Sequence, residues 1–69
     1  MNENGYFRFD LWLYNELRKR GMKQIDLAEK SGVSISAIHY LLRNKQQPTM
    51  RVLAMILNAL DMHMEFVSN

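Results

Sequence analysis

Residues 24–43 read QIDLAEKSGVSISAIHYLLR, and this pattern predicts two short helices joined by a tight turn. Gly32 stands at the turn, where glycine adopts a positive φ without steric cost. Ser34 follows as a good N-cap for the second helix. Ala28 is small enough to let the two helices cross closely. The apolar residues expected to hold the second helix against the first are Val33, Ile38 and Leu41.

The second helix of the pair, expected over residues 35–43, has two different faces when its residues are spaced at about 100°. One arc is apolar and suits a core. The other arc carries hydrogen-bonding side chains, with an isoleucine available for a thymine methyl group: Ile35, Ser36, His39, Tyr40 and Arg43. This mixture is typical of a helix that reads base edges in the major groove of DNA. A hairpin that only packs against its neighbours would not need polar groups all along its outer arc.

A further helix is expected before this pair. Asp10 would cap it, and it would run over residues 11–20 until Gly21 ends it. Leu13 and Leu17 lie four residues apart and therefore share one face.

The remaining helices are expected over residues 24–31 and 50–60. Asn44 follows the helix over residues 35–43, and asparagine accepts the left-handed conformation that often ends a helix. Thr49 would cap the last helix, directly after Pro48. The expected apolar residues are Ile25, Leu27 and Ala28 in the second helix, and Leu53, Ile56, Leu57 and Leu60 in the last.

The two ends of the chain differ from its helical centre. Residues 1–8 have no periodicity and predict a flexible or loosely docked arm. Residues 62–67 alternate between two sets of side chains, which fits a half-buried strand. Two explanations stay open: the segment forms a fifth helical turn, or it is a β-strand that pairs with another molecule, because no second strand is predicted in the chain. In the second explanation the dimer interface is formed by Met62, Met64 and Phe66.

Length and composition limit the class of protein. The 69 residues allow a single domain, covering residues 1–69. Cysteine is absent, which excludes disulfides and thiolate metal sites and fits the reducing cytoplasm, where we expect the protein to act. No apolar run approaches the roughly 18 residues that a membrane span needs, and the N-terminus lacks the pattern of a signal peptide. We therefore expect no membrane association.

The distribution of charge is more informative than its sum. The net charge is only +2. However, the lysines and arginines gather in the central segment, where they are opposed only by Asp26 and Glu29: Arg18, Lys19, Arg20, Lys23, Lys30, Arg43 and Lys45. A local basic surface favours a phosphate-bearing partner.

Catalysis and metal binding have no basis in the sequence. His39 and His63 lack an acidic or histidine partner at the spacing of metal ligands. The chain has no nucleophile–base arrangement and no glycine-rich phosphate loop. We expect a protein that is not an enzyme and that needs neither a cofactor nor a metal.

Residues 9–62 resemble the Cro/repressor-type helix-turn-helix family, also called the xenobiotic-response-element family. The matching residues are Leu17, Arg18, Gly21, Met22, Gln24, Leu27, Ala28, Gly32, Val33, Ser34, Ile38, Pro48, Thr49, Leu53, Ala59 and Leu60. The resemblance implies an all-α, lambda-repressor-like bundle of four to five short helices. It also implies binding of palindromic operator DNA as a homodimer. One departure is Lys23, where the family often has a Ser or Thr cap.

The family's contacts can be carried over to matching positions. Gln24 would contact a DNA phosphate, as would Asn44 and Lys45 beyond the recognition helix. Tyr40 would reach a base or the backbone. The residues that would face base edges are Ser34, Ile35, Ser36, His39 and Arg43. The tail over residues 62–67 resembles one found in some antitoxin members, where two such strands pair across the dimer.

The function expected from these observations is sequence-specific transcriptional regulation, with repression as the expected form and activation left open. One alternative is the antitoxin of a toxin–antitoxin operon, with a toxin as protein partner. A phage regulator is equally compatible. A third alternative, from a different class, is a protein-interaction module whose helix-turn-helix no longer meets DNA.

Overall fold

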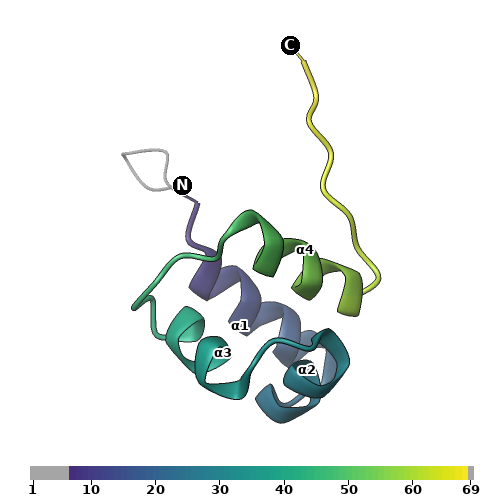
Figure 1. Ribbon diagram of the computed structural model, residues 1–69. Helices are drawn as coiled ribbons and strands as arrows, with labels where there is room; N and C mark the ends of the chain where they lie inside the picture. The colour runs from purple at the N-terminus through teal and green to yellow at the C-terminus, as the bar shows by residue number, and fades with distance from the viewer. Residues whose placement is uncertain (1–6, 69) are drawn as a thin grey trace.

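The computed structural model describes residues 7–68 and contains four helices in that range. They are α1 (Phe9–Arg20), α2 (Gln24–Ser31), α3 (Ile35–Leu42) and α4 (Met50–Ala59). Helix α1 packs against α3, and α2 packs against both α3 and α4 (Figure 1). The predicted all-α bundle with a helix-turn-helix is therefore confirmed, with four helices over the described residues.

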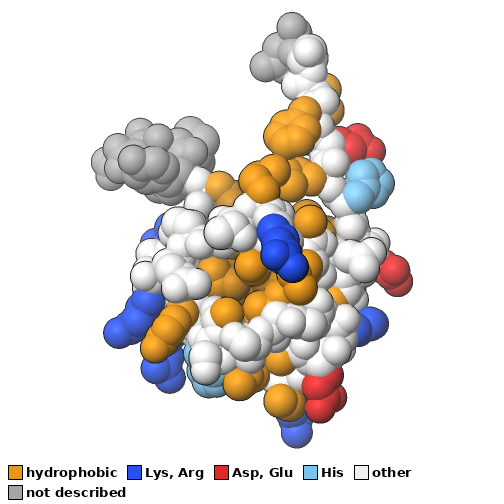
Figure 2. Space-filling model, in the orientation of Figure 1, with side chains coloured by type: hydrophobic (Ala, Val, Ile, Leu, Met, Phe, Trp, Pro, Cys, Tyr) orange, Lys and Arg blue, Asp and Glu red, His pale blue; other side chains and the backbone are white. Residues whose placement is uncertain are grey.

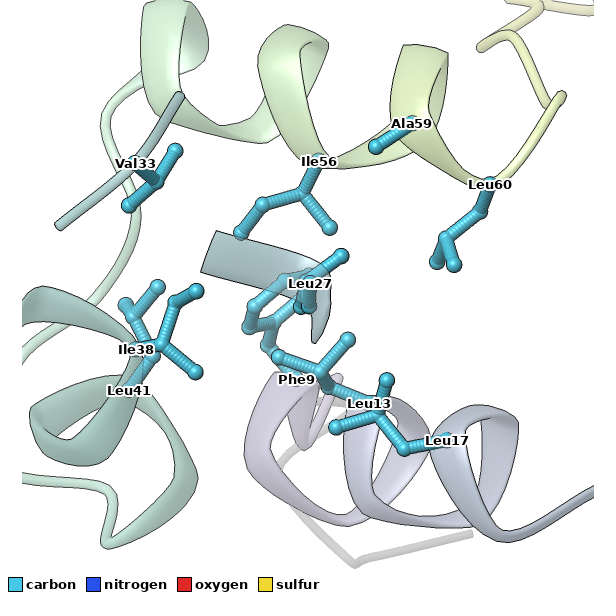
Figure 3. Packing of buried hydrophobic residues seen from close by; sticks show 10 residues of the cluster. All are labelled: Phe9, Leu13, Leu17, Leu27, Val33, Ile38, Leu41, Ile56, Ala59 and Leu60. Atoms are coloured by element: carbon cyan, nitrogen blue, oxygen red, sulfur yellow. The ribbon is translucent and has the colours of Figure 1, made fainter. Parts of the chain in front are cut away.

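One apolar core joins all four helices (Figure 3). Its centre is made of side chains with no exposed surface, one from each helix: Leu13, Leu27, Ile38 and Ile56. Burying one such side chain contributes about 1.5–3 kcal/mol, so the core fixes α3 relative to the rest of the bundle. The other buried members of the cluster are Phe9, Leu17, Val33, Leu41, Ala59 and Leu60.

Helix α2 contributes fewer of its apolar side chains to this core than its sequence predicts. Leu27 is fully buried and Ala28 is half-buried, as expected. Ile25, however, is 49% exposed, so its predicted place in the core is wrong. Helices α3 and α4 pack against α2 and cover Leu27, whereas the side chain of Ile25 stays exposed to solvent.

Two of the predicted caps are formed. The Ser34 hydroxyl accepts a hydrogen bond from the Ala37 N–H at 3.1 Å, and the Thr49 hydroxyl accepts one from the Val52 N–H at 3.1 Å. Each bond satisfies one of the N–H groups that the first turn of a helix leaves without a partner. The start of α3, and with it the direction of the helix, is thus fixed by its own sequence.

The predicted cap of α1 is wrong. This helix begins at Phe9, which places Asp10 inside the first turn rather than before it. The Arg8 guanidinium donates two hydrogen bonds to the Asp10 carboxylate, at 2.9 and 2.8 Å. These bonds lower the pKa of Asp10, against the opposing effect of burial. A carboxylate is also favoured in the first turn by the helix dipole.

Left-handed residues end the helices. Gly21 (φ 62°) and Gly32 (φ 82°) follow α1 and α2, and Asn44 (φ 57°) follows α3 as predicted. Beyond Asn44, the Lys45 N–H bonds back to the Tyr40 carbonyl at 2.9 Å, which closes the end of α3. Asp61 (φ 59°) follows α4 in the same left-handed conformation, which was not predicted from the sequence.

The two ends of the chain lie outside the helices, and the pairing predicted for the C-terminal end stays a prediction. Residues 1–6 of the predicted arm lie outside the described residues. Phe7 and Arg8 contact α1: Arg8 binds Asp10, and the Phe7 ring centroid lies 6.4 Å from that of Trp12. Within residues 62–68 there is neither a strand nor a fifth helical turn, and this tail runs away from the helices (Figure 1).

Candidate nucleic-acid interface

Helix α3 presents one polar face to solvent and one apolar face to the core. Ile38 and Leu41 are buried, at 0% and 1% exposure, and they hold the helix in place. On the opposite side, Ser36 and Tyr40 are exposed. Ile35 and His39 are half-buried along the border between the two faces. The structure therefore gathers the predicted base-reading side chains of α3 on one outward face.

Ser34 has a second task besides the predicted contact with DNA. Its hydroxyl oxygen already accepts the cap bond from Ala37, but its residue is exposed and its O–H can still donate outward. A hydroxyl group in this position can cap the helix and contact a ligand at the same time.

The chain after α3 carries three predicted contacts with a fixed backbone. Arg43 ends the helix as its C-cap, and Asn44 and Lys45 follow, all three exposed. The Asn44 side-chain oxygen accepts a bond from the Gln47 side-chain N–H at 3.1 Å. Because hydrogen bonds connect this turn to α3 and to Gln47, the side chains of Arg43 and Lys45 start from a fixed backbone.

The start of α2 is organised differently from the start of α3. Lys23 is the N-cap residue, and its ammonium group has no acceptor with which to cap the helix. Only the reverse bond is present, from the Lys23 N–H to the Asp26 carboxylate at 2.9 Å. Gln24, the first residue of the helix, is half-buried. Its side-chain oxygen is buried and has no hydrogen-bond partner among the described residues.

Ion pairing separates the basic residues into two groups. At the end of α1, the Glu16 carboxylate binds Lys19 at 2.9 Å and Arg20 at 3.2 Å, and these bonds lower the pKa of Glu16. Among residues 7–68, by contrast, no carboxylate pairs with Arg43 or Lys45. Figure 2 shows blue and pale-blue side chains gathered over α3 and the loop that follows it.

Two basic residues near Gln24 were not among the predicted contacts. A shallow hollow of about 380 Å³ is lined in part by Arg18, Lys23 and Gln24. Arg18 lies over the Tyr14 ring, with 5.8 Å between the guanidinium carbon and the ring centroid. The sequence signal was present in both cases as a cation close to the start of α2, but helical spacing alone did not place Arg18 beside Lys23.

The predicted dimerisation residues differ in their position relative to the groove beside the tail. Met62 and Met64 line an open groove of about 590 Å³, together with Phe9, Trp12 and Leu57. Phe66 is 85% exposed and does not line this groove.

Over residues 7–68, no group of three His, Cys, Asp or Glu side chains has the arrangement of a metal site. None of the helices in this range combines the length and the apolar character required to cross a membrane.

Comparison with known proteins gives one result at the level of the family. The model of the family described as Helix-turn-helix matches residues 13–67, which is most of the chain. The match spans the whole of α2, α3 and α4 and the greater part of α1. Searches of curated proteins and of solved structures found no match.

Proposed function

Because the chain belongs to the Cro/repressor-type helix-turn-helix family of DNA-binding regulators, we propose that it is a repressor. It would bind operator DNA as a homodimer, with α3 of each copy in the major groove. A palindromic operator follows from the twofold symmetry of such a dimer, and its half-sites would lie about 34 Å apart.

The observation that carries this proposal is the outward face of α3. Its polar side chains project from a helix that is anchored on the other side by fully buried residues. Reading bases requires side chains held in fixed positions, because each hydrogen bond to a base edge depends on geometry. The base-reading residues would be Ser34, Ile35, Ser36, His39 and Arg43, with Tyr40 reaching a base or the backbone.

Phosphate contacts would flank this face on both sides. Lys45 and Asn44 lie directly after α3, where their backbone is fixed by the helix end. Gln24 lies at the start of α2, where the N–H groups of the first turn and the helix dipole favour an anion. Such contacts would supply much of the affinity and make it depend strongly on salt.

A second candidate function is that of an antitoxin, which binds DNA through α3 and a toxin through another surface. The groove beside the tail favours it, because this apolar surface involves neither α2 nor α3. A module that no longer binds DNA is the remaining alternative, and the absence of DNA binding by the parent protein would support it.

Charge reversal after α3 tests the assignment of the DNA-binding face. Arg43→Glu combined with Lys45→Glu should reduce the affinity for selected DNA by at least about 100-fold, because two favourable phosphate or base contacts become repulsive. Both side chains are exposed, so the circular dichroism spectrum and melting curve should stay close to those of the parent. Binding would be measured by fluorescence anisotropy at fixed salt.

The matched control is Lys30→Glu. Lys30 is also exposed, but it lies in the last turn of α2, at the opposite end of that helix from Gln24. Its reversal should weaken binding only a few-fold, through the change in net charge. Unchanged binding by the Arg43/Lys45 double variant would show that the face has been assigned wrongly.

A further inference from the structure

Three aromatic side chains form a cluster at the start of α1. The ring centroids of Phe7 and Trp12 lie 6.4 Å apart, and those of Phe9 and Trp12 lie 5.7 Å apart. All three residues line the groove beside the tail. Phe9 belongs to the buried core, whereas Phe7 is 68% exposed and Trp12 is half-buried. The cluster therefore offers the groove an aromatic surface that the core of the protein does not use.

The groove has the size of a small-molecule site. Its volume is about 590 Å³, within the range of about 300–1,000 Å³ that is usual for such sites. Leu53 and Leu57 of α4 and Met62 and Met64 of the tail extend its apolar walls. Methionine side chains adapt to the shape that they contact. From residue 63 to residue 68, moreover, no backbone–backbone hydrogen bond forms within the described chain, so the wall formed by the tail can adjust to a ligand.

The charged groups of the groove favour a positive ligand. Glu65 and His63 line it from the tail, with 2.8 Å between Glu65 Oε2 and His63 Nε2. Its described lining residues include neither lysine nor arginine. Arg8, which is next to the aromatic cluster in the sequence, is held by the Asp10 carboxylate at 2.8 and 2.9 Å. A carboxylate near aromatic rings suits a cation, because both the ring faces and the carboxylate attract positive charge.

The extent of the groove favours a small molecule over a protein. Eleven described residues line it, whereas one side of a stable protein–protein interface usually contains about 20–30 residues. A second copy or another protein would therefore need more surface than the groove provides. A small molecule needs only the groove, because sites of this size bury most of their ligand.

We propose that the groove beside the tail binds a small organic cation with an apolar body. The ligand is a primary or quaternary amine that carries an aryl or alkyl group. Its apolar body lies against Trp12 and Phe7, and its positive charge lies near the Glu65 carboxylate. This binding site goes beyond the proposed function and does not depend on it.

Three probes with one apolar body test the preference for positive charge: 4-phenylbutylamine, 4-phenylbutanol and 4-phenylbutyrate. At pH 8 they are a cation, a neutral molecule and an anion, and histidine is ordinarily neutral. Trp12 is the single tryptophan and lines the groove, so its fluorescence in the full-length protein reports binding. The amine should bind saturably and at least about 10-fold more tightly than the butyrate, with the alcohol between them. Because the net charge of the chain is +2, its overall field favours the anion, and the opposite preference must arise in the groove.

Removal of the Glu65 charge tests its role. Glu65→Gln should weaken binding of the amine at least about 5-fold and leave binding of the alcohol unchanged, because only the amine uses the charge. Glu29→Gln is the matched control. It changes the net charge equally, but Glu29 is an exposed residue of α2 and does not line the groove. Its three affinities should stay within about twofold of the parent values, because a distant exposed charge is screened.

Removal of one aromatic ring tests the position of the apolar body. Phe7→Ala should weaken binding of all three probes at least about 3-fold, because the lost apolar surface serves each of them. Phe66→Ala is the control: Phe66 is exposed and aromatic but does not line the groove, so its loss should leave the three affinities unchanged. Circular dichroism would confirm that both variants stay folded.

Several outcomes would overturn this inference. Equal affinities for the amine and the butyrate would do so, as would equal effects of Glu65→Gln and Glu29→Gln or of Phe7→Ala and Phe66→Ala. A fluorescence change that does not saturate would also do so, because it would show non-specific partition. Amine binding that weakens as the protein concentration rises would overturn it in favour of a second copy as the cover of the groove. Failure to bind any DNA would defeat the proposed function and leave the results with these probes unaffected.

Discussion

Single residues with a positive φ set the ends of the helices and so the angle between α2 and α3. Gly32 carries this role in the turn between them, at φ 82°. A Cβ placed on it would meet the end of the Met55 side chain at 3.6 Å, which is an ordinary contact. The requirement for glycine is therefore one of backbone conformation rather than of space.

Gly32→Ala should lower the free energy of unfolding by about 1–2 kcal/mol, the cost of the left-handed conformation for an L-residue. Urea denaturation followed by circular dichroism would measure it. Asn44→Gly is the informative companion: it relieves the same strain at φ 57° and should leave stability equal or raise it. Full stability of Gly32→Ala would contradict this account of the turn.

The Arg8–Asp10 pair should give the protein a specific response to acid. The hydrogen bonds from Arg8 lower the pKa of Asp10 in the folded state, so the pair stabilises the fold above the ordinary aspartate pKa. This stability is lost as the pH falls from that ordinary value through the lowered one. Asp10→Asn should therefore be less stable than the parent at neutral pH, and the difference should shrink in acid. Thermal melts at a series of pH values would show whether the two curves converge.

Local rules explain which of these residues could be predicted from sequence. Ser34, Thr49 and Asn44 act through their own backbone or that of residues three or four positions away, and each was predicted correctly. Asp10 was misplaced because aspartate is favoured both as an N-cap and within the first turn. The choice between the two depended on Arg8, whose side chain reaches Asp10 only once the turn exists.

At the scale of elements, α3 combines two groups of residues with different tasks. Its buried side chains hold the helix, and its exposed side chains are proposed to read DNA. The periodicity of an amphipathic helix was sufficient to separate the two groups. The same reasoning failed for Ile25, because α2 is short and its pattern does not tell which of its sides the neighbouring helices cover.

The two faces of α3 should separate in mutagenesis. Ile38→Ala should cost about 2–5 kcal/mol of stability, because it opens a cavity at a fully buried site. Ser36→Ala should stay within about 0.5 kcal/mol of the parent and yet alter the preferred DNA sequence. Denaturation curves and binding to a panel of operator variants would be compared. A stable Ile38→Ala, or a Ser36→Ala variant with reduced stability and unchanged preference, would contradict this division of labour.

At the scale of the whole molecule, two surfaces differ in chemistry and in proposed function. The outward face of α3 is polar and basic, whereas the groove beside the tail is apolar. The alternation of the tail was visible in the sequence, but residues 62–68 form no strand in one copy, because a strand without a neighbour in its own chain is not stable by itself. The folded core could therefore be predicted from sequence, while the homodimer expected from the tail stays a prediction.

The central claim is that two copies of α3 read a palindromic operator. Selection of bound sequences from random double-stranded DNA, with purified full-length protein, tests it most directly. We predict an enriched consensus of two inverted half-sites whose centres lie about one helical turn, roughly 34 Å, apart. Enrichment of no sequence above the input, or the same consensus selected by the Arg43→Glu/Lys45→Glu variant, would contradict the account.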